Sequence, residues 1–223
     1  MIVKPPDSLQ ARLAAQRERL DPDHPASAAR LRGLHAHLRG LHASAADLDA
    51  ELAGTTRWAL LHDLHLQLNG RSLWIDHILI NRQLDILVLE SPHYGADLRV
   101  DAQGRFSVLR DGRDLELPSP LARCARHLAG LRQLARQLPW PHRQGSRVSP
   151  CWLSAILIAP HAQLDAHPRY QDPLVRPAAL PDWLASHTRH PERSTLDTLA
   201  HSISVDTLRG FARQLAQRHC AEG

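Results

Sequence analysis

Asp76 and Glu90 are the two residues whose types and spacing first suggest chemistry. They lie in a long, mostly aliphatic stretch that runs from Trp74 to Gly95. If this stretch folds as two antiparallel strands that turn symmetrically about Gln83, Asp76 lies directly opposite Glu90, because both are equally far from the turn. Directly opposed side chains share a face of the sheet, with Cβ atoms about 4.5–5.5 Å apart. A slip of the register by one residue would put the two acids on opposite faces.

A pair of carboxylates so placed needs a compensating positive charge. The two groups repel each other unless one takes up a proton or a cation lies between them. A hard divalent ion such as Mg²⁺ suits two carboxylates, and a bound metal ion can activate water against a phosphodiester. The pattern therefore suggests Asp76 and Glu90 as metal ligands and catalytic residues, with Mg²⁺ as the cofactor. The alternative is that either acid caps a strand end or pairs with a nearby arginine.

The segment in front of this pair is predicted to be helical over residues 1–55. Leu9, Leu13 and Leu20 lie on one face of a short helix, which ends at the proline-containing segment 21–25. A second stripe follows at spacings of three, four and seven: Leu31, Leu34, Leu38, Leu41, Leu48 and Leu52. The two stripes favour an antiparallel helical hairpin. It either braces its own domain or forms a homodimer through the leucines.

From residue 58 to residue 118 the apolar side chains follow the spacing expected of β-strands. Residues 58–68 form a plausible strand that ends at the turn pair Asn69-Gly70. Residues 73–80 and 84–90 are mostly apolar at both odd and even positions, as expected for central strands that are covered on both faces of the sheet. Short alternating runs at 98–100, 106–108 and 115–117 predict a meander that is exposed on one side.

The remaining third of the chain is predicted to mix both element types. Ser119-Pro120 opens a helix that runs to about Leu138. A buried strand follows at 151–159, and 160–191 should be mostly irregular. Two last helices are expected to begin near Ser194 and Ser204.

The composition sets limits without identifying a function. No apolar run approaches the roughly 20 residues that span a bilayer, so we expect no membrane segment. Cys124, Cys151 and Cys220 form no CxxC pair, which fits a reducing cytoplasm. The net charge of +4 is compatible with nucleic-acid binding and equally with an ordinary solvated surface.

The 16 histidines show no metal-binding pattern. His62 and His65 lie three apart in a predicted strand, so they should point to opposite faces. We therefore expect scattered surface histidines rather than a zinc site.

Several segments of the chain together match the pattern of a known family. They are 75–80, 88–90 and 94–95, the upstream strand 58–64, and the downstream segments 104–106 and 119–121. In this order they resemble the NERD domain, the nuclease-related domain of bacterial proteins. The resemblance covers roughly Gly40 to Leu138. It implies membership of the PD-(D/E)xK nuclease superfamily, in which an Asp and a Glu on adjacent strands hold Mg²⁺ and a Lys two residues past the Glu helps to activate water.

The sequence departs from that family pattern at three positions. Pro92 takes the place of the lysine, and Lys4 is the only lysine in the chain. The acid of the family's Gly-Glu pair falls on Leu41, and its frequent glutamine falls on Arg123. His93 could replace the missing base near neutral pH, although a regular strand would point it away from Glu90.

Arginines on the helix after Ser119 are candidates for nucleic-acid binding. Arg123 and Arg126 form one pair, and Arg132 and Arg136 form another one turn apart. In the nuclease fold this helix flanks the metal site, so the resemblance implies that the stripe, with His93, could meet a phosphate backbone. The alternative is an ordinary solvated helix face.

The sequence as a whole predicts an α/β fold, with a mixed central sheet flanked by helices as in restriction-endonuclease-like cores. We expect a helical hairpin over 1–55, a nuclease-like core over 56–140 and a C-terminal extension over 141–223 that completes or caps the core. The predicted function is a cytoplasmic, NERD-like protein that engages DNA, with weak or no metal-dependent hydrolysis. The alternative is a pseudonuclease that acts as a nucleic-acid- or protein-binding scaffold.

Overall fold

The computed structural model describes residues 1–21, 24–110, 113–143, 146–148, 150–188 and 202–220. Its centre is a mixed six-stranded sheet in the order β1-β2-β3-β4-β10-β12. The strands of this sheet are β1 Ile2–Lys4, β2 Trp58–Leu68, β3 Arg71–Asn81, β4 Asp85–Glu90, β10 Cys151–Leu157 and β12 Leu174–Val175. The β2–β3–β4 meander is antiparallel, whereas β1, β10 and β12 pair with their neighbours in parallel. The predicted α/β class with a mixed central sheet is confirmed.

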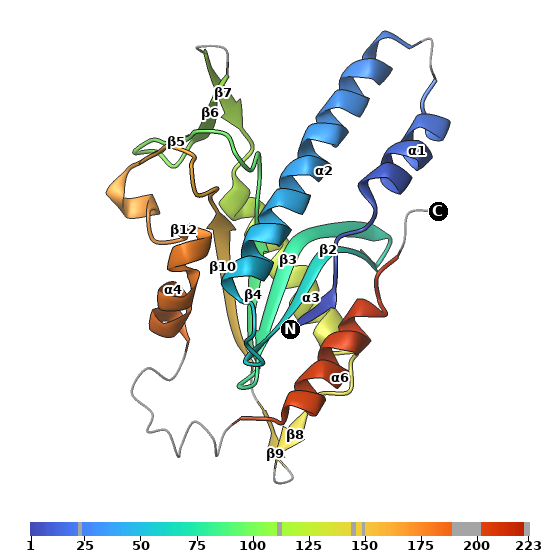
Figure 1. Ribbon diagram of the computed structural model, residues 1–223, viewed down its shortest axis with the longest axis vertical. Coiled ribbons are helices and arrows are strands. Elements are labelled where there is room, and N and C mark those ends of the chain that lie inside the picture. The colour runs from blue at the N-terminus through green and yellow to red at the C-terminus, as the bar shows by residue number, and fades with distance from the viewer. Residues whose placement is uncertain (22–23, 111–112, 144–145, 149, 189–201, 221–223) are drawn as a thin grey trace.

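Helices cover both faces of this sheet (Figure 1). On one face, α2 Pro25–Glu51 and α4 Leu180–His187 pack on the cluster that contains Leu79 and Leu87. On the other face, α3 Pro120–Ala135 and α6 Val205–Ala216 pack on the cluster that contains Ile78 and Val88. The side chains on both faces of the central strands are therefore buried, as predicted.

The N-terminal helical hairpin is also confirmed, with α1 Leu9–Arg19 packed beside α2. Ser8 caps the first helix, and Pro25 stands in the first turn of the second, where its missing N–H costs nothing. The leucine stripe of α2 is buried from Leu38 to Leu52 within its own chain, and only Leu31 and Leu34 are half-exposed. A homodimer through this stripe stays a prediction.

A second, four-stranded sheet lies beside the first in the order β11-β5-β6-β7. Its strands are β5 Leu98–Val100, β6 Phe106–Arg110, β7 Arg113–Leu117 and β11 Leu164–Ala166. One face packs on β10 and α3 through a cluster that includes Phe106 and Ile158, while β7 is mostly exposed. The expected meander, exposed on one side, is thus present as a separate sheet.

The region 160–191 is more ordered than the sequence predicted. The described part contains β11, the 3-10 turns η1 Pro168–Tyr170 and η2 Pro177–Ala179, strand β12 and helix α4. The expectation of irregular structure was wrong because three of the prolines, Pro168, Pro177 and Pro181, stand in the first turn of a helical element, a position that tolerates proline.

The other predicted boundaries differ by small amounts. The helix after Ser119 ends at Ala135, and the strand near 151 ends at Leu157. Helix α6 starts after Ser204, as expected, and the helix expected near Ser194 lies outside the described residues. A short hairpin of β8 His142–Arg143 and β9 Ser146–Arg147 precedes β10. Among the described residues, no helix is long and apolar enough to cross a membrane.

Strand β2 changes face at Asp63. This residue has a left-handed φ of 53°, which is uncommon outside glycine. Leu61 and Leu64 lie three apart yet belong to the same core cluster, whereas a regular strand would place them on opposite faces. The change of face turns His62 and Asp63 away from that cluster and toward the N-terminal helices.

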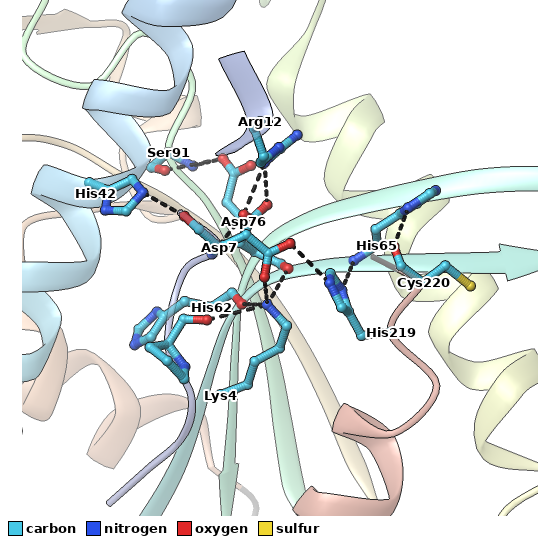
Figure 2. Close-up of polar contacts among 12 residues, drawn as sticks. Lys4, Asp7, Arg12, His42, His62, His65, Asp76, Ser91, His219 and Cys220 are labelled. Atoms are coloured by element: carbon cyan, nitrogen blue, oxygen red, sulfur yellow. Dashed lines mark hydrogen bonds and ion pairs between the residues drawn. The ribbon is translucent and has the colours of Figure 1, made fainter. Parts of the chain in front are cut away.

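Segments near the N-terminus and the C-terminus meet beside this irregularity, where Lys4 and Asp7 lie close to His219 (Figure 2). Lys4 donates to the carbonyls of His62 and Asp63 at 3.1 and 2.9 Å and forms an ion pair with Asp7 at 2.9 Å. His219 reaches Asp7 at 2.9 Å from the C-terminal side. The only lysine of the chain is therefore used to hold the N-terminal arm against β2.

Candidate functional site

Asp76 and Glu90 lie opposite each other, as the symmetric turn predicted. In the register of β3 and β4, His77 pairs with Leu89 and Ile78 pairs with Val88, so the next position places Asp76 opposite Glu90. Both side chains are buried: Asp76 is 4% exposed and Glu90 is 0% exposed. The sheet therefore brings two carboxylates together in a place that water scarcely reaches.

Arg123 of α3 lies between these carboxylates. Its Nη2 is 2.8 Å from Oε2 of Glu90 and 3.3 Å from Oδ2 of Asp76. The contact with Glu90 is an ion pair rather than a well-aligned hydrogen bond, since Oε2 accepts no hydrogen bond from any described residue. The guanidinium thus occupies the bridging position that two opposed carboxylates offer to a cation.

Each carboxylate has a second partner of its own. Nδ1 of His127, one helical turn after Arg123, lies 2.5 Å from Oε1 of Glu90. The backbone N–H of Ser91 donates to Oδ2 of Asp76 at 2.7 Å, and the Ser91 hydroxyl donates to the same oxygen at 3.1 Å. The pair is therefore held from α3 on one side and from the end of β4 on the other.

The two carboxyl groups differ in acidity. Burial raises the pKa of Asp76, but the charge of Arg123 and the N–H of Ser91 help to outweigh it, so the pKa lies below its ordinary value. Burial and the neighbouring Asp76 raise the pKa of Glu90, and the opposing effects of His127 and Arg123 do not cancel the rise. Asp76 is thus the member that keeps its charge, and Glu90 is the member that takes up a proton more readily.

A chain of buried polar groups connects this site to the α2 face of the sheet. Nδ1 of His62 lies 2.8 Å from Nδ1 of His77, and Nε2 of His62 lies 3.1 Å from Oδ1 of Asp49. Nε2 of His77 lies 2.9 Å from the Ser44 hydroxyl and 3.2 Å from the Ser91 hydroxyl. Ser91 therefore belongs both to this chain and to the carboxylate site.

The chain fixes its own proton positions. With Asp49 ionised, Nε2 of His62 donates to it, so Nδ1 of His62 accepts the proton of Nδ1 of His77. Nε2 of His77 then accepts from a serine hydroxyl. Burial and the neighbouring His62 lower the pKa of His77 to about 3, which keeps it neutral. Because the Ser91 hydroxyl donates to Asp76, the hydroxyl that donates to Nε2 of His77 is that of Ser44. The two histidines are thus structural donors and acceptors that join β2 and β3 to α2.

A cleft of about 630 Å³ opens beside Arg123. Its lining includes Arg126, His93 and Pro92, three of the residues that the sequence had singled out, so these three lie on one surface. His93 follows the end of β4 in a left-handed conformation with a φ of 50°, so the regular strand assumed for it does not extend that far. Arg123 lines the cleft too, but its guanidinium is turned to the carboxylates.

Sequence reasoning missed the partners of the carboxylates. The interval of four between Arg123 and His127 places both on one face of α3, and this signal could have indicated His127. His62 and His77 are equally far from the Asn69-Gly70 turn, so the symmetry of that hairpin could have indicated their pairing. The contacts of Ser44 with His77 and Ser91 gave no such signal, because they depend on how α2 packs on the sheet. Only the alternative in which an acid pairs with a nearby arginine anticipated this arrangement.

The residues as arranged do not fit a divalent cation. Arg123 already supplies the bridging charge, and the position that a lysine would take is Pro92. In the described ranges, no group of three or more His, Cys, Asp or Glu side chains could hold a metal ion. The nuclease relationship implies divalent metal use in the family, and the Mg²⁺ predicted for this chain is not confirmed.

Comparison with protein families gives a match to NERD, the nuclease-related domain, over residues 39–158. The match covers more than half of the 223 residues and includes β2 to β4, α3 and β10. The chain therefore belongs to the nuclease-related domain family. The predicted superfamily, PD-(D/E)xK, fits this family. Neither the curated proteins nor the solved structures gave a match.

Proposed function

We propose that this nuclease-related protein binds nucleic acid at the cleft beside Arg123 without hydrolysing it by a metal-dependent mechanism. One observation carries the proposal: the Arg123 guanidinium lies between Asp76 and Glu90, where a catalytic cation would have to bind. DNA is the nucleic acid that the family relationship favours.

The burial of the carboxylates also supports the absence of metal-dependent hydrolysis. Glu90 is completely buried, so neither a metal ion nor a phosphodiester reaches it unless α3 moves. Arginine stays protonated at all ordinary pH values, so Arg123 cannot act as a general base in place of the missing lysine. The fold is thus retained, whereas the chemistry at the carboxylates is replaced by an internal ion pair.

Binding is supported by the charge of the cleft. Arg126 lines it together with His37 and His93, and no Asp or Glu is among its lining residues in the described part of the chain. Arg123 lines it too, but its charge is balanced by Asp76 and Glu90. The cleft therefore attracts anions, and nucleic-acid affinity from such groups falls as salt is added.

The test combines metal binding, cleavage and affinity. We expect no saturable heat when Mg²⁺ or Mn²⁺ is titrated into the wild-type protein or into Asp76→Asn. DNA binding, followed by fluorescence anisotropy, should be unchanged by a chelator and weakened by Arg126→Ala. Arg136→Ala, an exposed change at the far end of the same helix, should leave it unchanged.

Cleavage of DNA that depends on Mg²⁺ or Mn²⁺ and disappears in Asp76→Asn would overturn the proposal in favour of a working nuclease. Absence of any nucleic-acid binding at low salt would leave a protein-binding scaffold as the function to be examined. The cleavage assay and the anisotropy assay thus decide separate halves of the proposal.

A further inference from the structure

The cleft has a second, apolar wall that phosphate binding does not explain. Leu115 of β7 lines it and pairs across the strands with Val108 of β6, and Leu117 lies on the same face of this four-stranded sheet. Only three large apolar side chains are exposed in the described part of the chain, and two of them, Leu109 and Leu115, line this cleft. Exposed apolar groups gathered at one concave surface are typical of binding sites.

The charged and apolar walls face the same space. Arg123 and Arg126 come from the first two turns of α3, whereas Leu115 and Leu117 come from the β7 edge that leads into that helix. The start of α3 carries no acidic residue in its first turn, so its N-terminus adds to the positive potential. A ligand that fills the cleft must therefore combine a negative charge with an apolar body.

We propose that the cleft holds one unstacked nucleotide of single-stranded nucleic acid, with its phosphate at Arg126 and the N-terminus of α3 and its base against Leu115 and Leu117. The volume of about 630 Å³ lies within the range of pockets that enclose small organic ligands. A duplex cannot fill both walls, because its base faces are stacked and hidden, whereas a single strand can turn a base outward. The inference rests on the proposed nucleic-acid binding and makes it specific for single strands.

The test compares the affinity of the protein for a labelled single strand with its affinity for the corresponding duplex at the same salt concentration. A strand of about 16 nucleotides is long enough to fill a typical single-strand site. We expect the wild-type protein to bind the single strand about tenfold more tightly, as one base contact provides. Leu115→Ser should remove most of this preference and leave duplex affinity and its salt dependence unchanged. Ile2→Ser on β1 is the matched control, because Ile2 is 52% exposed and Leu115 is 44% exposed.

A second variant guards against a folding defect. Leu115→Tyr offers an aromatic face to the base, so it should tighten single-strand binding, a change that partial unfolding cannot produce. Equal affinity for both strand forms, with no effect of either Leu115 variant, would overturn the inference while the proposed binding function stands. Binding of an acidic, apolar peptide in place of either nucleic acid would overturn both.

Discussion

Arg123 and Glu90 join α3 to β4 through an ion pair in which Nη2 lies 2.8 Å from Oε2. The carboxylate is fully buried and the arginine side chain is 30% exposed, so the negative partner depends on the positive one for its compensation. Loss of one partner in such a pair costs more than loss of both, because the remaining charge is left buried and unpaired.

This relationship predicts strong coupling in a double-mutant cycle. Arg123→Ala should lower the free energy of unfolding by about 3–5 kcal/mol, the usual cost of a broken buried pair. Adding Glu90→Gln should recover about 1–3 kcal/mol of that loss, since the glutamine carries no charge. Urea denaturation of the four proteins measures the cycle, and strict additivity would show that the two residues do not act as a pair.

The His62–His77 contact predicts that stability falls in mild acid. Burial lowers the pKa of His77 to about 3, against an ordinary value of 6.5 in the unfolded chain. Between these values the unfolded state binds more protons than the folded state. Stability is therefore fully present above pH 6.5 and is lost as the pH falls toward 3, by up to about 1.4 kcal/mol per pH unit.

The measurement is the free energy of unfolding at several pH values inside that window, for wild type and for His77→Gln. The glutamine keeps a buried hydrogen-bonding group but does not titrate, so its pH slope should be smaller than that of the wild type. His35→Gln, at an exposed position of α2, should retain the wild-type slope. Identical slopes in all three proteins would contradict the assignment of the effect to His77.

Arg12 should be the most important arginine of the N-terminal hairpin. Its Nη1 reaches both carboxylate oxygens of Asp63, at 2.7 and 2.9 Å, and its guanidinium lies 4.8 Å from the ring centre of Trp74. Both partners are buried, so Arg12→Ala should cost about 3–5 kcal/mol of unfolding free energy. Arg17→Ala, exposed on the same helix, should change it by less than about 0.5 kcal/mol. A similar small effect of both changes in denaturant titrations would show that the Asp63 irregularity is stable without its arginine.

The sequence allowed prediction of features set by local periodicity and symmetry. The bounds of β2 and the register of Asp76 against Glu90 followed from alternation and from equal distances to Gln83. The left-handed Asp63 could not be predicted, because tertiary contacts with Arg12 and Lys4 stabilise a conformation that aspartate rarely adopts.

The partners of the carboxylate pair were harder to predict for a related reason. A sequence pattern identifies Arg123 as basic and places it on a helix, but whether its guanidinium meets solvent or the carboxylates depends on the packing of α3 against β4. The resemblance to nucleases suggested a phosphate for Arg123, and the structure places this side chain on Asp76 and Glu90 instead.

Removal of Arg123 should convert the carboxylate pair into a cation site. In Arg123→Ala the two opposed carboxylates lose the positive charge that lies between them. A Mn²⁺ or Mg²⁺ ion can then supply that positive charge. We expect saturable binding of Mn²⁺ by calorimetry in this variant, with a metal-dependent rise in melting temperature, and neither effect in the wild type. A ligand that binds only the folded state raises stability in proportion to the logarithm of its concentration, so the thermal shift reports binding even if the variant is marginally stable.

Two controls separate this effect from general metal binding. Arg126→Ala removes a neighbouring charge from the cleft but leaves the Asp76–Glu90 pair compensated, so it should behave as the wild type. Arg123→Ala combined with Asp76→Asn should lose the metal response, because one of the two ligands is then neutral. If the wild type and Arg123→Ala bind Mn²⁺ equally, the arginine does not compete with metal, and the carboxylate pair would then have to be regarded as a metal site in the unmodified protein.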